Sequence, residues 1–112
     1  MRTVQRFGLV IGTNPEKIEK YKELHSDGNS SVRDLLEKYH LTNFSIFIKQ
    51  LPDGKEYLFG YYEYVGENYQ KDMEKLNNEP RNIEWLKICD PCQIPLPGET
   101  SWAVMSEIFY NS

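Results

Sequence analysis

The chain has 112 residues, and 13 Lys and Arg against 17 Asp and Glu give it a formal net charge of −4. This length fits one domain over residues 1–112, and the acidic balance without a basic cluster disfavours nucleic-acid and anionic-membrane partners. The short apolar run near the N-terminus is too brief to span a membrane and lacks a signal-peptide layout, so we expect a cytoplasmic protein.

The first third of the sequence predicts one strand followed by two helices. Residues Thr3 to Ile11 are apolar and β-branched, which is typical of a strand. Asn14, followed by a proline, is a strong helix start. Tyr21 and His25 lie one turn apart in that helix and share an inward stripe. A small polar loop then leads into a second amphipathic helix, whose predicted stripe consists of Val32, Leu35, Leu36 and Tyr39.

The middle of the chain predicts a β-hairpin. In "NFSIFIK" the side chains of Phe44, Ile46 and Ile48 alternate with those of their neighbours and so fall on one side. "EYLFGYYEYV" is a second alternating run, and "LPDGKE" between them carries a Pro-Asp-Gly turn signal. Apolar residues recur at helical spacing over residues 67–77 and again from Pro80 to Lys87, which predicts two further helical segments. The segment "SWAVMSEIFY" predicts a closing strand.

This order of elements predicts an α+β fold. We expect a ferredoxin-like βαββαβ arrangement, in which an antiparallel sheet has its helices on one face. The other face of the sheet would be open and rich in aromatic residues, which favours a homodimer of the dimeric α/β-barrel type.

The two cysteines form the sequence "CDPC", Cys89 to Cys92. A redox pair usually opens a helix after a strand, whereas this pair precedes a proline-punctuated segment. A structural zinc site would need two further ligands at suitable spacing, and we expect no metal. Loop cysteines in a reducing compartment are the favoured interpretation.

Acid–base chemistry is the reaction type that the remaining residues favour, because phosphate-loop and nucleophile-elbow motifs are missing. His25 is the best single candidate, although a structural histidine is the more common occupant of such a position. Glu107 is the one acid in the predicted last strand and would share a face with Met105 and Phe109, or point to solvent. Trp85 is a candidate for stacking on a sugar ring, or for core or interface packing.

Several segments together resemble the L-rhamnose mutarotase family, small dimeric α+β proteins. The resemblance runs over nearly the whole chain, through "RFGLVIGTNPEKIEKYKELH", "TNFSIF", "LPDGKEYLFGYYEYVG", "EWLKICDPCQIPLPG" and "EIFY". The "DPCQ-PLP" and "YLF-Y-EYVG" segments resemble a subgroup associated with L-fucose as well as L-rhamnose. The order and spacing of these segments carry the resemblance.

The resemblance implies a mutarotase that interconverts the α and β anomers of a free monosaccharide by acid/base ring opening, with no cofactor. The family's proton-donating histidine falls on His25, and its sugar-contacting tyrosine falls on Tyr21. A second family tyrosine falls on Phe44, and a tandem tryptophan pair falls on Trp85 and Leu86. Glu107 is a weaker candidate for contact with the sugar.

Three departures from the family pattern gather at these pocket positions. Phe44 lacks a hydroxyl, Leu86 lacks an aromatic ring, and Asn29 and Ser30 stand where the family usually has Trp-Pro. The sequence therefore predicts an altered pocket with a shifted substrate, weakened catalysis or none. The alternatives are a non-catalytic sugar-binding or regulatory dimeric module and a cofactor-free monooxygenase.

Overall fold

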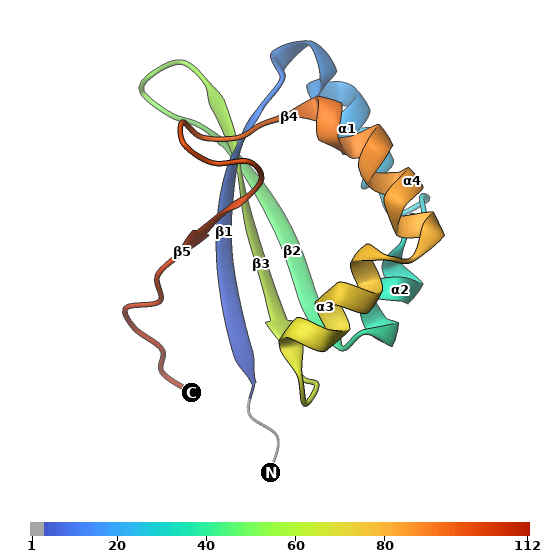
Figure 1. Ribbon diagram of the computed structural model, residues 1–112. Coiled ribbons are helices and arrows are strands. Elements are labelled where there is room, and N and C mark those ends of the chain that lie inside the picture. The colour runs from blue at the N-terminus through green and yellow to red at the C-terminus, as the bar shows by residue number, and fades with distance from the viewer. Residues whose placement is uncertain (1–3) are drawn as a thin grey trace.

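The fold is organised around the strand β1 (Gln5–Thr13), which lies in the middle of a curled sheet (Figure 1). The computed structural model describes residues 4–112, so the predicted strand start at Thr3 lies outside the described residues. β1 runs two residues beyond the predicted end at Ile11, because Gly12 and Thr13 pair with a later segment of the chain.

The sheet has the strand order β2-β3-β1-β4, with β5 also paired to β1, and every pairing is antiparallel. Its other strands are β2 (Leu41–Gln50), β3 (Glu56–Tyr64), β4 (Gln93–Ile94) and β5 (Ala103–Met105). This order confirms the ferredoxin-like arrangement, with β4 and β5 sharing the position of the last strand.

All the helices lie on one side of the sheet (Figure 1). They are α1 (Ile18–Leu24), α2 (Arg33–Lys38), α3 (Tyr69–Asn77) and α4 (Pro80–Cys89). A short 3₁₀ turn, Pro15–Lys17, precedes α1, and the Asn14 side chain accepts a hydrogen bond from the Glu16 amide at 3.1 Å. Within residues 4–112 no helix is long and apolar enough to cross a membrane.

The β2–β3 hairpin confirms the predicted hairpin and its alternation of side chains. Ile46 lies opposite Gly60 and Ile48 opposite Leu58, so the alternating apolar side chains face the helices. The turn closes where Leu51 and Lys55 are hydrogen bonded, and Gly54 takes φ = +82°, a conformation that glycine adopts at little cost.

Two groups of buried side chains join the helices to the sheet. The first joins α2 and α3 to the strand ends and consists of Val32, Leu35, Tyr39, Leu41, Tyr64 and Leu76. The second joins α1 to the middle of the sheet and consists of Ile11, Tyr21, Leu58 and Cys92. Most of the two predicted stripes is therefore confirmed as core, whereas Leu36 and His25 are only partly buried.

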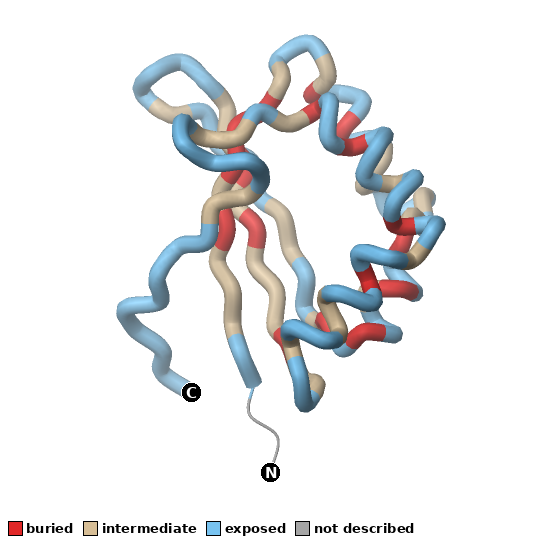
Figure 2. Tube along the Cα trace, in the orientation of Figure 1, coloured by how far each residue is buried: buried red, intermediate tan, exposed pale blue. Residues whose placement is uncertain are grey.

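The chain after β5 corrects the predicted closing strand. β5 ends at Met105, since it pairs with β1 only over Gly8–Val10 within the described residues. Residues 104–112 are exposed, and they run away from the helices as an extended tail (Figure 2). Glu107 lies in this tail, where its carboxylate pairs with the Arg6 guanidinium at 2.8 Å. The predicted strand position of Glu107 was therefore wrong.

The cysteines also differ from the prediction. Cys89 is the last residue of α4 and Cys92 ends the 3₁₀ turn Asp90–Cys92, and both side chains are buried. They are core residues at a helix end rather than loop residues. Burial raises the pKa of the Cys89 thiol to about 12, so this thiol stays protonated at neutral pH.

Candidate functional site

The centre of the candidate site is a stacked pair of rings at the end of α1. Tyr21 and His25 lie one helical turn apart, with ring centroids 4.2 Å apart and planes inclined by 28°. Tyr21 is 5% exposed, whereas the His25 ring is half-buried. The predicted pairing of these two residues on an inward stripe is confirmed.

The protonation of His25 follows from its hydrogen bond. Its Nδ1 lies 2.8 Å from the backbone carbonyl oxygen of Tyr21. A carbonyl oxygen can only accept, so Nδ1 carries the hydrogen and Nε2 keeps its lone pair. Burial lowers the pKa of His25 below its ordinary 6.5, and the nearby Arg33 guanidinium acts in the same direction, so the ring is neutral at pH 7.

Arg33 also fixes the loop that follows His25. Its guanidinium donates to the backbone carbonyl oxygens of His25 at 3.3 Å and Ser26 at 3.0 Å, which lie at the C-terminal end of α1. Beyond them, the Asn29 side chain accepts from the Ser31 amide at 2.9 Å, and Ser31 takes φ = +46°. The small polar loop is therefore held by its own hydrogen bonds where the family resemblance predicts Trp-Pro.

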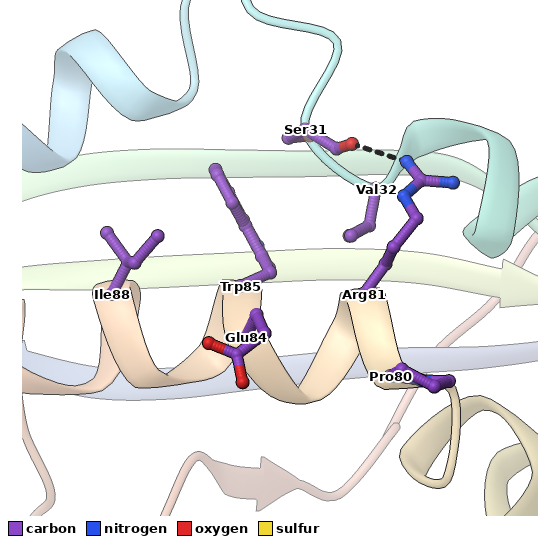
Figure 3. Close-up of a pocket in the computed structure, with 7 residues that line it drawn as sticks. All are labelled: Ser31, Val32, Pro80, Arg81, Glu84, Trp85 and Ile88. Carbon is purple, nitrogen blue, oxygen red and sulfur yellow. Dashed lines mark hydrogen bonds between the residues drawn. The ribbon is translucent and has the colours of Figure 1, made fainter.

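Trp85 reaches the same site from α4. Its ring meets the His25 ring edge-on, at 5.3 Å between centroids and 63° between planes. Trp85 also lines a groove of about 350 Å³ between α4 and the loop before α2, with Arg81 and Ile88 projecting from the same side of the helix (Figure 3). Trp85 thus contacts both this groove and the His25 ring, and His25 itself is not a lining residue of the groove.

Gln93 is a site residue that sequence reasoning missed. Its Nε2 donates a hydrogen bond to the Tyr21 hydroxyl oxygen at 3.2 Å, although the two residues are 72 positions apart. Burial raises the pKa of Tyr21 to about 12, while this bond from Gln93 acts in the opposite direction. Periodicity in the sequence gives no signal for such a contact, because it depends on how β4 docks beside β1.

Trp102 lies over the sheet beside the same buried group. A Cβ on Gly60 would come within 3.2 Å of the Trp102 ring, so glycine allows the ring to approach β3 closely. Trp102 also packs against the buried group that contains Tyr21. The two tryptophans near the Tyr21–His25 pair therefore come from α4 and from the segment before β5. They are not a tandem pair in the sequence.

The other predicted site residues lie apart from His25. The Phe44 ring packs on Tyr62, with centroids 5.1 Å apart. Leu86 is 39% exposed on α4, and Glu107 is held by Arg6 in the C-terminal tail. The structure thus brings together Tyr21, His25 and Trp85. Contact of the other three residues with a ligand stays a prediction.

Arg33 is the charged side chain that acts on the pKa of His25. Tyr21 and His25 are neutral at pH 7, and the Arg33 guanidinium is occupied by two backbone carbonyls. Within residues 4–112 no three His, Cys, Asp or Glu side chains gather as metal ligands would. The arrangement offers hydrogen-bonding groups and aromatic faces, which suit a neutral, polyhydroxylated ligand.

Comparison with known proteins gives one family model and several similar structures. Residues 6–111 match the family model described as L-rhamnose mutarotase. None of the curated protein sequences gives a significant match. Among solved structures, an L-rhamnose mutarotase from Formosa agariphila has a TM-score of 0.70 at 18% identity, covering 96% of this chain and 99% of that chain.

Two further solved structures share the fold. A protein described as an antibiotic biosynthesis monooxygenase from Nitrosomonas europaea has a TM-score of 0.55 at 14% identity, over 100% of this chain and 97% of that one. A conserved protein from Methanosarcina mazei Go1 has a TM-score of 0.54 at 16% identity, over 91% of this chain and 90% of that one. At these identities the likeness concerns the fold alone.

Proposed function

The chain belongs to the L-rhamnose mutarotase family, and from this premise we propose that it is a cofactor-independent aldose mutarotase. The proposed reaction interconverts the α and β anomers of a 6-deoxy sugar, L-rhamnose or L-fucose. The observation that supports it best is the stacked Tyr21–His25 pair, in which Nε2 of a neutral imidazole keeps its lone pair.

His25 would move the proton in this reaction. Its Nε2 takes the proton of the anomeric hydroxyl as the bond between C1 and the ring oxygen breaks, which gives an open-chain aldehyde. The same nitrogen then returns the proton to the former ring oxygen. One nitrogen can serve both oxygens because both are bonded to C1 in the closed ring and are still close together as that bond breaks. After rotation of the aldehyde, the reverse steps close the ring on either face.

Tyr21 would assist as a hydrogen-bond donor. Its raised pKa keeps the hydroxyl protonated throughout the neutral range, so it stabilises negative charge on the sugar oxygen without giving up its proton. Trp85 would pack against the apolar face of the sugar, and Phe44 and Leu86 would reshape the rest of the pocket.

Saturation-transfer NMR on the anomers of L-rhamnose and L-fucose tests this proposal. We expect faster anomer exchange with the wild-type protein than in buffer, loss of that acceleration in His25→Ala, and retention in the control His40→Ala. Exchange that survives His25→Ala would remove the assignment of the acid/base. Sugar binding without faster exchange would instead favour the non-catalytic binding module.

We also propose that the protein is a homodimer. The sheet face opposite the helices carries Val10, Phe47 and Phe59 in register across three strands, and Phe47 is 65% exposed. Apolar side chains on an uncovered sheet face are typical of a protein–protein interface.

A further inference from the structure

The side chain of Gln93 is held in a fixed place beside the candidate site. β4 pairs with β1 so that Gln93 lies opposite Thr13, with its side chain on the helix side of the sheet. The segment before it is tied to the start of the first helix. There the Asn14 amide donates to the Cys92 carbonyl at 2.9 Å, and the Asn14 side chain donates to the Pro91 carbonyl at 3.2 Å.

The amide of Gln93 has two functional ends, and the structure uses one of them. Nε2 donates to the Tyr21 hydroxyl oxygen at 3.2 Å. The hydrogen bonds among residues 4–112 leave Oε1 unused, and that part of the chain has no buried side-chain oxygen or nitrogen that lacks a partner. Oε1 of the half-buried Gln93 is therefore reachable from solvent.

The bond from Gln93 also directs the Tyr21 hydroxyl. A phenol oxygen that accepts one hydrogen bond still has its own hydrogen to donate. Because Nε2 faces the oxygen of Tyr21, the Tyr21 hydrogen must point to another acceptor. The pair thus offers one donor, the Tyr21 hydroxyl, and one acceptor, Gln93 Oε1, next to the ring of His25.

We propose that Gln93 is a specificity-determining residue: its Nε2 orients the Tyr21 hydroxyl, and its Oε1 accepts a hydrogen bond from a ring hydroxyl of the sugar. This inference rests on the proposed function for the identity of the ligand. A neutral amide selects a neutral hydroxyl in this place, and a sugar that lacks this hydroxyl leaves Oε1 without its partner.

The test is a double-mutant cycle between protein and ligand. Dissociation constants are measured by NMR titration for L-rhamnose and its 2-, 3- and 4-deoxy analogues, with wild-type protein, Gln93→Leu and the control Gln70→Leu on an exposed face of α3. For wild type and the control, we expect one analogue to bind about threefold to tenfold more weakly, the range of one neutral hydrogen bond. In Gln93→Leu that penalty should disappear.

The variant Gln93→Glu tests the donor Nε2 and the acceptor Oε1 separately. It also keeps the inference testable if Gln93→Leu fails to fold. A carboxylate keeps an acceptor for the sugar but cannot donate to Tyr21, so it accepts a hydrogen bond from the Tyr21 hydroxyl instead. We expect the deoxy-analogue penalty to persist and the anomer-exchange rate of the bound sugar, kcat, to fall. A Gln93→Glu variant with wild-type rate and wild-type affinities would overturn the inference.

The outcomes distinguish this inference from the proposed function. Wild-type protein that binds L-rhamnose, but speeds anomer exchange of neither L-rhamnose nor L-fucose, refutes the mutarotase. The measured affinities for the deoxy analogues still test the role of Gln93 in that case. Faster exchange together with unchanged analogue penalties in Gln93→Leu refutes the role of Gln93 alone. Failure to bind any of these four sugars or L-fucose overturns both proposals.

Discussion

At the scale of single residues, the position of one hydrogen decides the chemistry of His25. The Tyr21 carbonyl that Nδ1 contacts belongs to the preceding turn of the same helix, so α1 itself fixes the tautomer. Burial then disfavours the charged ring, because the cation loses more solvation than the neutral form. The hydrogen bond selects the tautomer but raises the pKa of His25, and burial outweighs it. The result is a neutral imidazole with its basic nitrogen directed away from the helix, which is the form that a general base requires.

The first prediction concerns the pH at which His25 loses its proton. We expect its NMR titration midpoint below the ordinary 6.5, and anomer exchange that falls as the pH drops through that midpoint, because protonated Nε2 cannot accept a proton. The chain has 2 histidines, so spectra of His40→Gln assign the two signals. A midpoint above 6.5, or a rate that rises toward acid, would contradict the proposed base.

The second prediction tests how Trp85 shields that ring. In Trp85→Ala the edge of the His25 ring is opened to water, so the pKa of His25 should rise toward its ordinary value. Leu86→Ala is the matched control, since Leu86 is 39% exposed on the same helix. Equal midpoints in both variants, measured by the same titration, would show that Trp85 does not shield His25.

At the scale of elements, the join between β3 and α3 depends on a buried hydroxyl. The Tyr64 hydroxyl donates to the Asp72 carboxylate and accepts a hydrogen bond from the Asn68 amide at 2.9 Å. The same carboxylate pairs with the His40 ring at 3.1 Å. These bonds fix the first turn of α3 to the end of the strand, and the Tyr64 bond lowers the pKa of Asp72.

The third prediction compares two tyrosines that both donate to an aspartate. Tyr64→Phe should lower the free energy of unfolding by about 1.5–3 kcal/mol, the usual contribution of a hydrogen bond to a charged group, because Tyr64 is 0% exposed. Tyr57→Phe removes the bond to Asp53 at the exposed hairpin and should change stability little. Urea unfolding measures both, and equal losses would refute this role of burial.

The elements that sequence reasoning predicted are those with a local cause. A helical stripe identified Tyr21 and His25, and alternation with a Pro-Asp-Gly turn identified the hairpin. The last strand was predicted too long. Alternating side chains indicate a tendency to form a strand, but they do not show which strand the segment pairs with. Within the described residues, β5 pairs with β1 only over Gly8–Val10. Glu107 forms an ion pair with the Arg6 side chain instead of joining the strand. The Gln93 contact was missed because it depends on docking between distant segments.

At the scale of the whole molecule, the two faces of the sheet have different surroundings. Helices cover one face, where the buried groups and the candidate site lie (Figure 2). The other face presents Phe47 at 65% exposure, with Arg6 beneath the Tyr110 ring of the tail at 3.4 Å. A second copy that packs sheet against sheet would remove the apolar part of this face from water.

The last prediction therefore concerns the oligomeric state. Phe47→Glu places a carboxylate in the middle of the open face, where dimerisation would bury it unpaired, so we expect a dimer in the wild type and a monomer in the variant. Ile83→Glu is the control, because Ile83 is also an exposed apolar residue, at 40%, but lies on α4 among the helices. Light scattering coupled to size-exclusion chromatography measures the masses. Since the proposed catalytic groups lie on the helix side, the Phe47→Glu monomer should still bind the proposed sugar. A wild type that elutes as a monomer, or a Phe47→Glu variant that stays dimeric, would contradict this interface.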